Sequence, residues 1–207
     1  MNEMKEATLD LFFSNRFQEA EQVSRALNNQ RDCLAKMVGI LDEIRHYGHR
    51  LFFCGVGGGA GNGTHAAGDL FKSCRIKAIC LTDNTPVVTA ITNDEGWSRV
   101  FADQMDTWNF GQDDALFVFS VGGGDAERDI SRNIVEAVKF AKEKGGRVLG
   151  VVGKPDGYTA QKGDAVVVIP TVNPDYRTTH TESWQCYIAH LLTEALRQRS
   201  AKWESVV

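Results

Sequence analysis

Short apolar runs alternate with amphipathic helical segments from about residue 50 onward, and this alternation constrains the fold more than any other feature. The runs are rich in β-branched and aromatic residues, which is typical of strands. Strands that alternate with helices form a mainly parallel sheet covered on both faces. The expected strands are RLFFCG, IKAICLTD, ALFVFS, RVLGVVG and DAVVVIP. The pattern therefore predicts an α/β fold, a three-layer sandwich around a five-stranded sheet.

Helical spacing of apolar residues predicts the remaining elements. Two helices are expected between Thr8 and Arg45, a long amphipathic helical segment over residues 125–146, a turn from Tyr158 to Lys162, and a last helix from about Thr181 to Arg197. A chain of 207 residues with 43% hydrophobic residues suits one domain. We expect a single domain over residues 1–207, with N-terminal helices in 1–46 and an α/β core in 50–198.

Composition and charge restrict the kind of partner. The net charge is −4, and no run of Lys or Arg favours nucleic acid. No uncharged apolar stretch approaches membrane-spanning length and no signal peptide is recognised, so we expect a cytoplasmic protein that acts on a small molecule. Its five cysteines lack metal-type CxxC spacing and are expected to be mainly buried free thiols.

Two glycine-rich turns follow expected strands. The first spans Gly55 to Gly63 and the second Ser120 to Asp125, and each leads toward a helix. Ligands of parallel sheets bind beyond the carboxyl ends of the strands. Backbone N–H groups in such turns converge on an anion, and a helix N-terminus adds partial positive charge. These turns predict a phosphate site, although glycines can also serve only to make a turn tight.

A dinucleotide site is one alternative. Gly55, Gly57 and Ala60 have GxGxxA spacing, and Asp83 follows the next strand, where a ribose-binding acid could lie. A nicotinamide cofactor, however, gives no task to the second glycine turn or to the His and acid pairs elsewhere in the chain.

Those pairs lie on two expected helices. His65 and Asp69 are spaced i, i+4 and share a helix face, and Glu182 and His190 are eight apart and share a face of the last helix. Two imidazoles and two carboxylates suit a divalent metal such as zinc, and they equally suit proton transfer between adjacent carbons of a sugar. Taken singly, each residue could be an ordinary polar side chain of the surface or core.

The segments GVGGGAGNGTHAAGD, TNDEGW, FSVGGGD and TESWQCYIAH resemble the signature segments of sedoheptulose 7-phosphate isomerases, which have the SIS fold. The likeness covers roughly residues 10–195, and DGYTAQ and IPTVNP make it closest to the branch of capsule and nucleotide-heptose gene clusters. The resemblance implies an aldose–ketose isomerase that forms D-glycero-D-manno-heptose 7-phosphate through an ene-diol. It also implies a cytoplasmic homotetramer with active sites at subunit interfaces, and zinc.

The resemblance assigns roles to individual residues. Asp69 and His190 fall on catalytic positions, and the metal ligands would be His65, Asp69, Glu182 and His190. The implied substrate-binding residues are Val56, Gly57, Gly58, Gly59, Asp69, Asn93, Asp94, Ser120, Val121, Gly122, Asp125 and Glu182.

The chain departs from the family pattern in both turns. Val56 stands in a turn where the family carries an amide and a hydroxyl, and Ser120 is the only hydroxyl kept in the phosphate loop. Asp125 would repel phosphate unless its carboxylate caps the following helix. A non-catalytic SIS protein that binds a phosphosugar or bridges partner proteins is therefore the second hypothesis.

Overall fold

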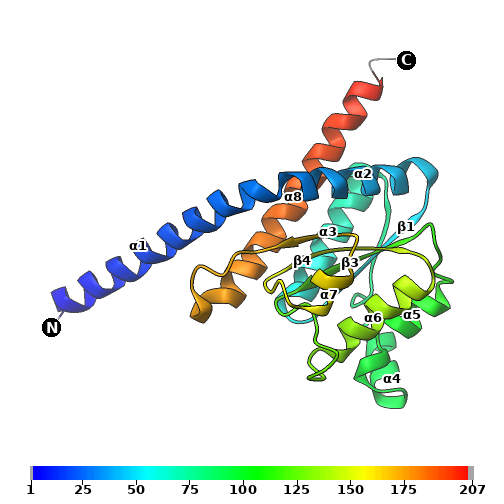
Figure 1. The fold of residues 1–207 in the computed structure, drawn as a ribbon, viewed down its shortest axis with the longest axis horizontal. Helices are drawn as coiled ribbons and strands as arrows, with labels where there is room; N and C mark the ends of the chain where they lie inside the picture. Colours follow the sequence, from blue (N-terminus) through cyan, green and yellow to red (C-terminus); the bar gives the residue numbers. More distant parts are fainter. Residues whose placement is uncertain (1, 205–207) are drawn as a thin grey trace.

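The fold is a five-stranded, all-parallel sheet between layers of helices, as predicted (Figure 1). This computed structural model describes the backbone of residues 2–204 and the side chains of residues 7–199. The strand order is β2-β1-β3-β4-β5. The strands are β1 (Arg50–Gly55), β2 (Lys77–Cys80), β3 (Ala115–Ser120), β4 (Arg147–Val152) and β5 (Ala165–Val168).

Eight α-helices surround the sheet in the described part of the chain. They are α1 (Asn2–Leu27), α2 (Arg31–Tyr47), α3 (Gly58–Cys74), α4 (Thr85–Asp94), α5 (Ala102–Thr107), α6 (Arg132–Glu143), α7 (Tyr158–Lys162) and α8 (Arg177–Glu204). Short 3-10 turns, including η2 (Trp97–Arg99) and η3 (Pro174–Tyr176), complete the connections. No helix among the described residues is long and apolar enough to span a membrane.

Alternation of side chains along the strands gives the sheet two apolar faces. Phe53 and Phe117 pack with residues of α2, α3 and α8 on one face. Phe52 and Leu116 pack with residues of α5 and α6 on the other. Because a strand presents successive side chains to opposite faces, continuous apolar runs such as RLFFC are buried on both sides.

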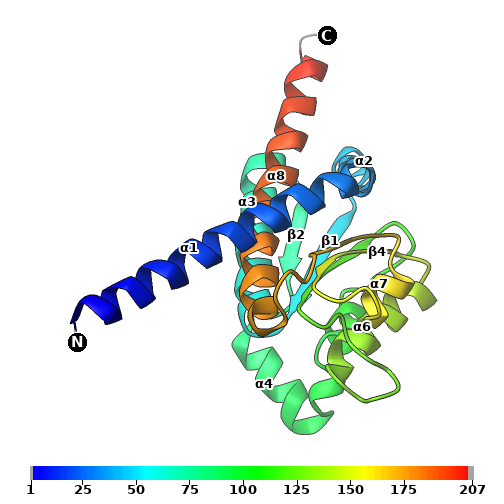
Figure 2. The ribbon, with the colours of Figure 1, turned by 60° about the vertical axis from the view of Figure 1, so that its left-hand side comes forward.

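Helix α1 projects well beyond the sheet, and its inner half is tied to the start of α8 (Figures 1 and 2). Glu19 accepts a hydrogen bond from the Asn173 amide (2.8 Å) and pairs with His180 Nε2 (3.0 Å). Burial by itself raises the pKa of Glu19, but these hydrogen bonds and the charge of Arg16 outweigh it and hold the pKa below its ordinary value. The guanidinium of Arg16 also stacks 3.8 Å from the ring centroid of Tyr176.

The segment after β3 differs from the prediction. Helix α6 begins only at Arg132, because residues 125–130 form a turn closed by two backbone hydrogen bonds between Asp125 and Ile130. The Asp125 carboxylate accepts the N–H groups of Glu127 and Arg128, so it stabilises this turn rather than capping the helix. A second difference is Tyr158–Lys162, which forms the short helix α7 instead of a turn.

Candidate active site

The two glycine-rich turns lie side by side at the carboxyl edge of the sheet. Strands β1 and β3 are neighbours, and their pairing ends with Gly55 opposite Phe119. Gly59 sits so close to β3 that a Cβ atom there would be 2.5 Å from the Phe119 carbonyl oxygen. The two turns are therefore neighbours, and the phosphate site at them stays a prediction.

The first turn leads directly into α3. Gly57 has a φ of 58° and precedes the first helical residue, Gly58, a conformation that an L side chain adopts only with strain. The first N–H groups of a helix have no partner within the helix, and the helix dipole places positive potential at the same point. The helix dipole thus favours an anion at Gly58, and the Glu182 carboxylate already lies against this residue.

The second turn is held by its own polar groups. Ser120 Oγ accepts the Gly123 N–H at 3.0 Å, and Gly123 and Gly124 both have positive φ. The backbone N–H of Arg128, together with the charge of that residue, lowers the pKa of Asp125 below its ordinary value. The Arg128 guanidinium lies 2.7 Å from the Asp125 carboxylate, which reduces the repulsion this acid would exert on an anion.

A cavity of about 750 Å³ opens beside the first turn. It is lined by Val56, Trp97, Ser98, Asp129, Ser131, Arg132 and Asn133. Of these residues, only Val56 was predicted as a site residue. Asn93 and Asp94 are exposed at the end of α4 and bond to each other at 2.7 Å, shortly before Trp97 and Ser98.

Helices α3 and α8 lie side by side and run in the same direction (Figure 2). Asn62 donates to the Glu182 carbonyl at 2.8 Å and to Gln185 at 3.1 Å, whereas Cys74, farther along α3, approaches the Thr193 carbonyl, farther along α8. Gln185 is fully buried and anchors α8 to β4 through the Val151 carbonyl. This parallel register decides which side chains of the two helices meet.

His65, Asp69 and His190 come together in that register. Asp69 Oδ2 lies 3.3 Å from His65 Nε2 and 3.3 Å from His190 Nδ1. The two imidazole rings meet edge to face with centroids 5.0 Å apart. Both histidines are about half exposed and Asp69 is one-third exposed, so the group is open to a ligand.

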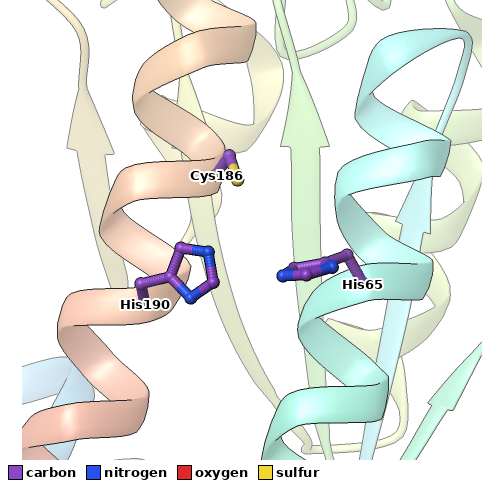
Figure 3. A group of neighbouring side chains, drawn as sticks. All are labelled: His65, Cys186 and His190. Atoms are coloured by element: carbon purple, nitrogen blue, oxygen red, sulfur yellow. The ribbon is translucent and has the colours of Figure 1, made fainter.

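Glu182 and Cys186 differ from their predicted positions relative to His65, Asp69 and His190. The Glu182 carboxylate lies against Gly58, at the start of α3, and so beside the glycine turn. Cys186, which sequence reasoning placed among the buried thiols, is half-buried and lies with His65 and His190 (Figure 3). The potential ligand atoms of these three residues are all within 4.8 Å of one another.

The acid of the dinucleotide alternative is engaged elsewhere. Asp83 accepts a hydrogen bond from Thr64 Oγ1 at 2.5 Å, which fastens the end of β2 to α3. This contact gives Asp83 a structural task of its own.

Comparisons with known proteins indicate the family of the chain. Residues 17–153 match the family model of the SIS domain. The chain is 31% identical over 170 residues to the lincomycin biosynthesis protein LmbN of Streptomyces lincolnensis, covering 79% of this chain and 62% of that one. It is 29% identical over 173 residues to the phosphoheptose isomerase of Aliarcobacter butzleri, covering 81% and 86%.

Solved structures show the same architecture. Phosphoheptose isomerase GmhA from Neisseria gonorrhoeae superposes with a TM-score of 0.78 at 24% identity, covering 91% of this chain and 99% of that one. A phosphoheptose isomerase from Francisella tularensis gives 0.79 at 22% identity, covering 90% and 96%.

Proposed function

The chain belongs to the SIS domain family, and on this premise we propose that it is a sugar-phosphate aldose–ketose isomerase. The substrate we assign is sedoheptulose 7-phosphate, which the enzyme interconverts with D-glycero-D-manno-heptose 7-phosphate. Curated phosphoheptose isomerases of similar length support this assignment.

One observation carries the proposal: a single carboxylate oxygen of Asp69 stands 3.3 Å from a nitrogen of each of two histidines. Isomerisation of a 2-ketose needs a base at one carbon and a group that moves a proton at the neighbouring oxygen. A carboxylate flanked by imidazoles supplies both, and its partly exposed position admits the open-chain sugar.

We place the phosphate at the glycine-rich turns. The N-terminus of α3 at Gly58 offers positive potential beside the cavity. Arg132 also lines the cavity, where its charge is shared with Asp129 at 3.3 Å and Glu136 at 2.7 Å. Asn93, Asp94 and Glu182 would bind sugar hydroxyls, Glu182 from its place against Gly58. Backbone N–H groups then replace the side-chain hydroxyls that this chain lacks.

Two side chains, Asp69 and His190, would carry out the proton transfers. Asp69 takes the proton from the carbon next to the carbonyl, while His190 delivers a proton to the carbonyl oxygen, which gives the ene-diol. Asp69 then returns the proton to the former carbonyl carbon while His190 takes the hydroxyl proton from the neighbouring carbon, which becomes the aldehyde and restores both groups. Holding both groups beside the reacting carbons supplies much of the rate acceleration.

The donor set fits a divalent metal. Imidazole nitrogens together with a carboxylate are ordinary zinc ligands, and the 3.3 Å spacings approach the roughly 3.4 Å that separates neighbouring ligands of tetrahedral zinc. When bound, the metal would polarise the sugar carbonyl. His65, Asp69 and His190 would hold it, and Glu182 was the fourth ligand predicted from sequence.

We further propose that the cytoplasmic enzyme is a homotetramer with active sites at subunit interfaces. Helix α1 supports this, because its residues 9–17 include exposed apolar side chains that a monomer would leave in water. These are Leu9, Leu11, Phe12, Phe13 and Phe17, and Phe17 is 75% exposed.

The direct test is incubation of the purified protein with sedoheptulose 7-phosphate, with and without a chelator, followed by NMR. We expect the aldose signals to appear. Binding of the sugar phosphate with no exchange at any metal concentration would instead support a phosphosugar-binding protein.

A further inference from the structure

Cys186 stands one helical turn before His190, so both side chains project from the same face of α8 toward α3 (Figure 3). Opposite them, the imidazole of His65 points from α3 toward His190. A sulfur and nitrogens from two helices thus face a common space, with all three ligand atoms within 4.8 Å of one another.

Glu182 belongs to a different level of the helix pair. Its carboxylate lies against Gly58, seven residues before His65 along α3, a displacement of about 10 Å along the helix axis. Asn62, one turn beyond Gly58, donates a hydrogen bond to the Glu182 carbonyl, so the backbone of Glu182 lies before the level of His65. Cys186 lies one turn farther along α8, and its sulfur is within 4.8 Å of a ring nitrogen of His65.

We propose that Cys186, rather than Glu182, completes the metal site as a thiolate ligand beside His65 and His190, which leaves a position of the ion open for the sugar. The inference rests on the proposed function for the idea of a metal, but it assigns a ligand set of this chain's own. Neighbouring ligand atoms of tetrahedral zinc are about 3.4–3.8 Å apart, so the sulfur and the nitrogens need to close by only about 1 Å.

The chemistry of the set selects the ion. A site with one thiolate and two imidazoles favours zinc over magnesium and manganese, which prefer oxygen ligands. Cys186 is half-buried between the helices while the two histidines are half exposed, so the sulfur is sheltered and the ion has an open path.

Cobalt substitution tests the sulfur ligand without any reference to isomerase activity. Full-length protein loaded with Co²⁺ should show a near-ultraviolet charge-transfer band that only a thiolate ligand produces. C186S should lose this band, and its zinc affinity, measured by competition with a chromophoric chelator, should fall more than about 100-fold. Circular dichroism of C186S checks that the fold is kept.

Two matched variants make the test decisive. C33S removes the other half-buried cysteine, and E182Q removes the carboxylate predicted from sequence. Both should keep the band and a zinc affinity within about threefold of wild type. A band that persists in C186S, or zinc binding lost in E182Q and kept in C186S, would overturn the proposal.

Protection of the thiol gives a second measurement should C186S fold poorly. Zinc should block alkylation of Cys186 in the wild-type protein, located by mass spectrometry, and should give no protection in H65A. Equal alkylation with and without saturating zinc would refute the thiolate ligand. Zinc binding through Cys186 in a protein that does not isomerise the sugar would support this inference and refute the proposed function. Isomerisation that needs no metal, in a protein without the cobalt–thiolate band, would support the proposed function and refute this inference.

Discussion

Asp69 is the residue on which the proposed chemistry depends, because one of its oxygens faces both histidines. We expect Asp69→Asn to lower kcat/KM by about 10²- to 10⁴-fold, since an amide cannot act as the base. The side chain is one-third exposed, so the free energy of unfolding should stay close to wild type. Steady-state kinetics with sedoheptulose 7-phosphate and a urea titration measure the two effects.

Asp113→Asn is a suitable control for this change, because Asp113 is an exposed carboxylate remote from the site. It should leave both measurements unchanged. Turnover by Asp69→Asn equal to that of the control would remove Asp69 from the mechanism.

The sequence predicted individual site residues only where helix periodicity and the family resemblance were enough. The i, i+4 spacing of His65 and Asp69 and the family position of His190 identified residues that the structure brings together. Cys186 was missed because its aromatic and apolar neighbours in WQCYI suggest a core thiol. Whether Glu182 or Cys186 faces His65 depends on the register of two helices distant in the sequence, and periodicity contains no information about that register.

At the scale of elements, the close approach of α3 to β3 depends on Gly59. A Cβ atom in Gly59→Ala would meet the Phe119 carbonyl oxygen at 2.5 Å, and backbone atoms cannot easily give way. We expect a loss of about 1–3 kcal/mol in the free energy of unfolding, measured by urea denaturation.

Gly61→Ala is the matched control in the same helix, because a Cβ atom at this position would have no neighbouring atom within 4 Å. Alanine is the better helix former, so this variant should gain about 0.5–1 kcal/mol. Two variants of equal stability would show that α3 is not held against β3 in the way described.

The attachment of α1 should depend on pH. The pKa of Glu19 is lowered in the folded protein, so this residue stabilises the fold above its unfolded pKa of about 4.3 and loses that contribution as pH falls through the folded value. Glu19→Gln should therefore be less stable than wild type at pH 7 and nearly equal to it at the acid end. Urea midpoints at several pH values provide the measurement, and a difference that does not change with pH would contradict it.

The elements themselves were largely predictable, since continuous apolar runs and helical periodicity marked all five strands and the principal helices. The residue at which α6 begins could not be predicted from the sequence in this way. Residues 126–131 contain charged side chains compatible with a helix, but the Asp125 carboxylate binds the Glu127 and Arg128 N–H groups and favours a turn. Local propensity alone cannot rank these two outcomes.

For the whole molecule, the proposed homotetramer would bury the exposed apolar side chains of α1. The double variant Phe13→Ser, Phe17→Ser removes two exposed rings, so on this proposal we expect smaller species in analytical ultracentrifugation. If active sites form between subunits, isomerase activity should fall with it. A double variant that keeps the wild-type mass would exclude this surface from the assembly.

Because α3 and α8 run parallel, each turn of one helix lies beside a turn of the other. The hydrogen bond from Asn62 to Gln185 joins the two helices, and the proposed metal ligands lie on the turns that follow. A metal ligand such as Glu182 can then be replaced by Cys186, one helical turn farther along α8, while the backbone stays in place. Exchanging one donor for another at a neighbouring turn would therefore leave the fold unchanged.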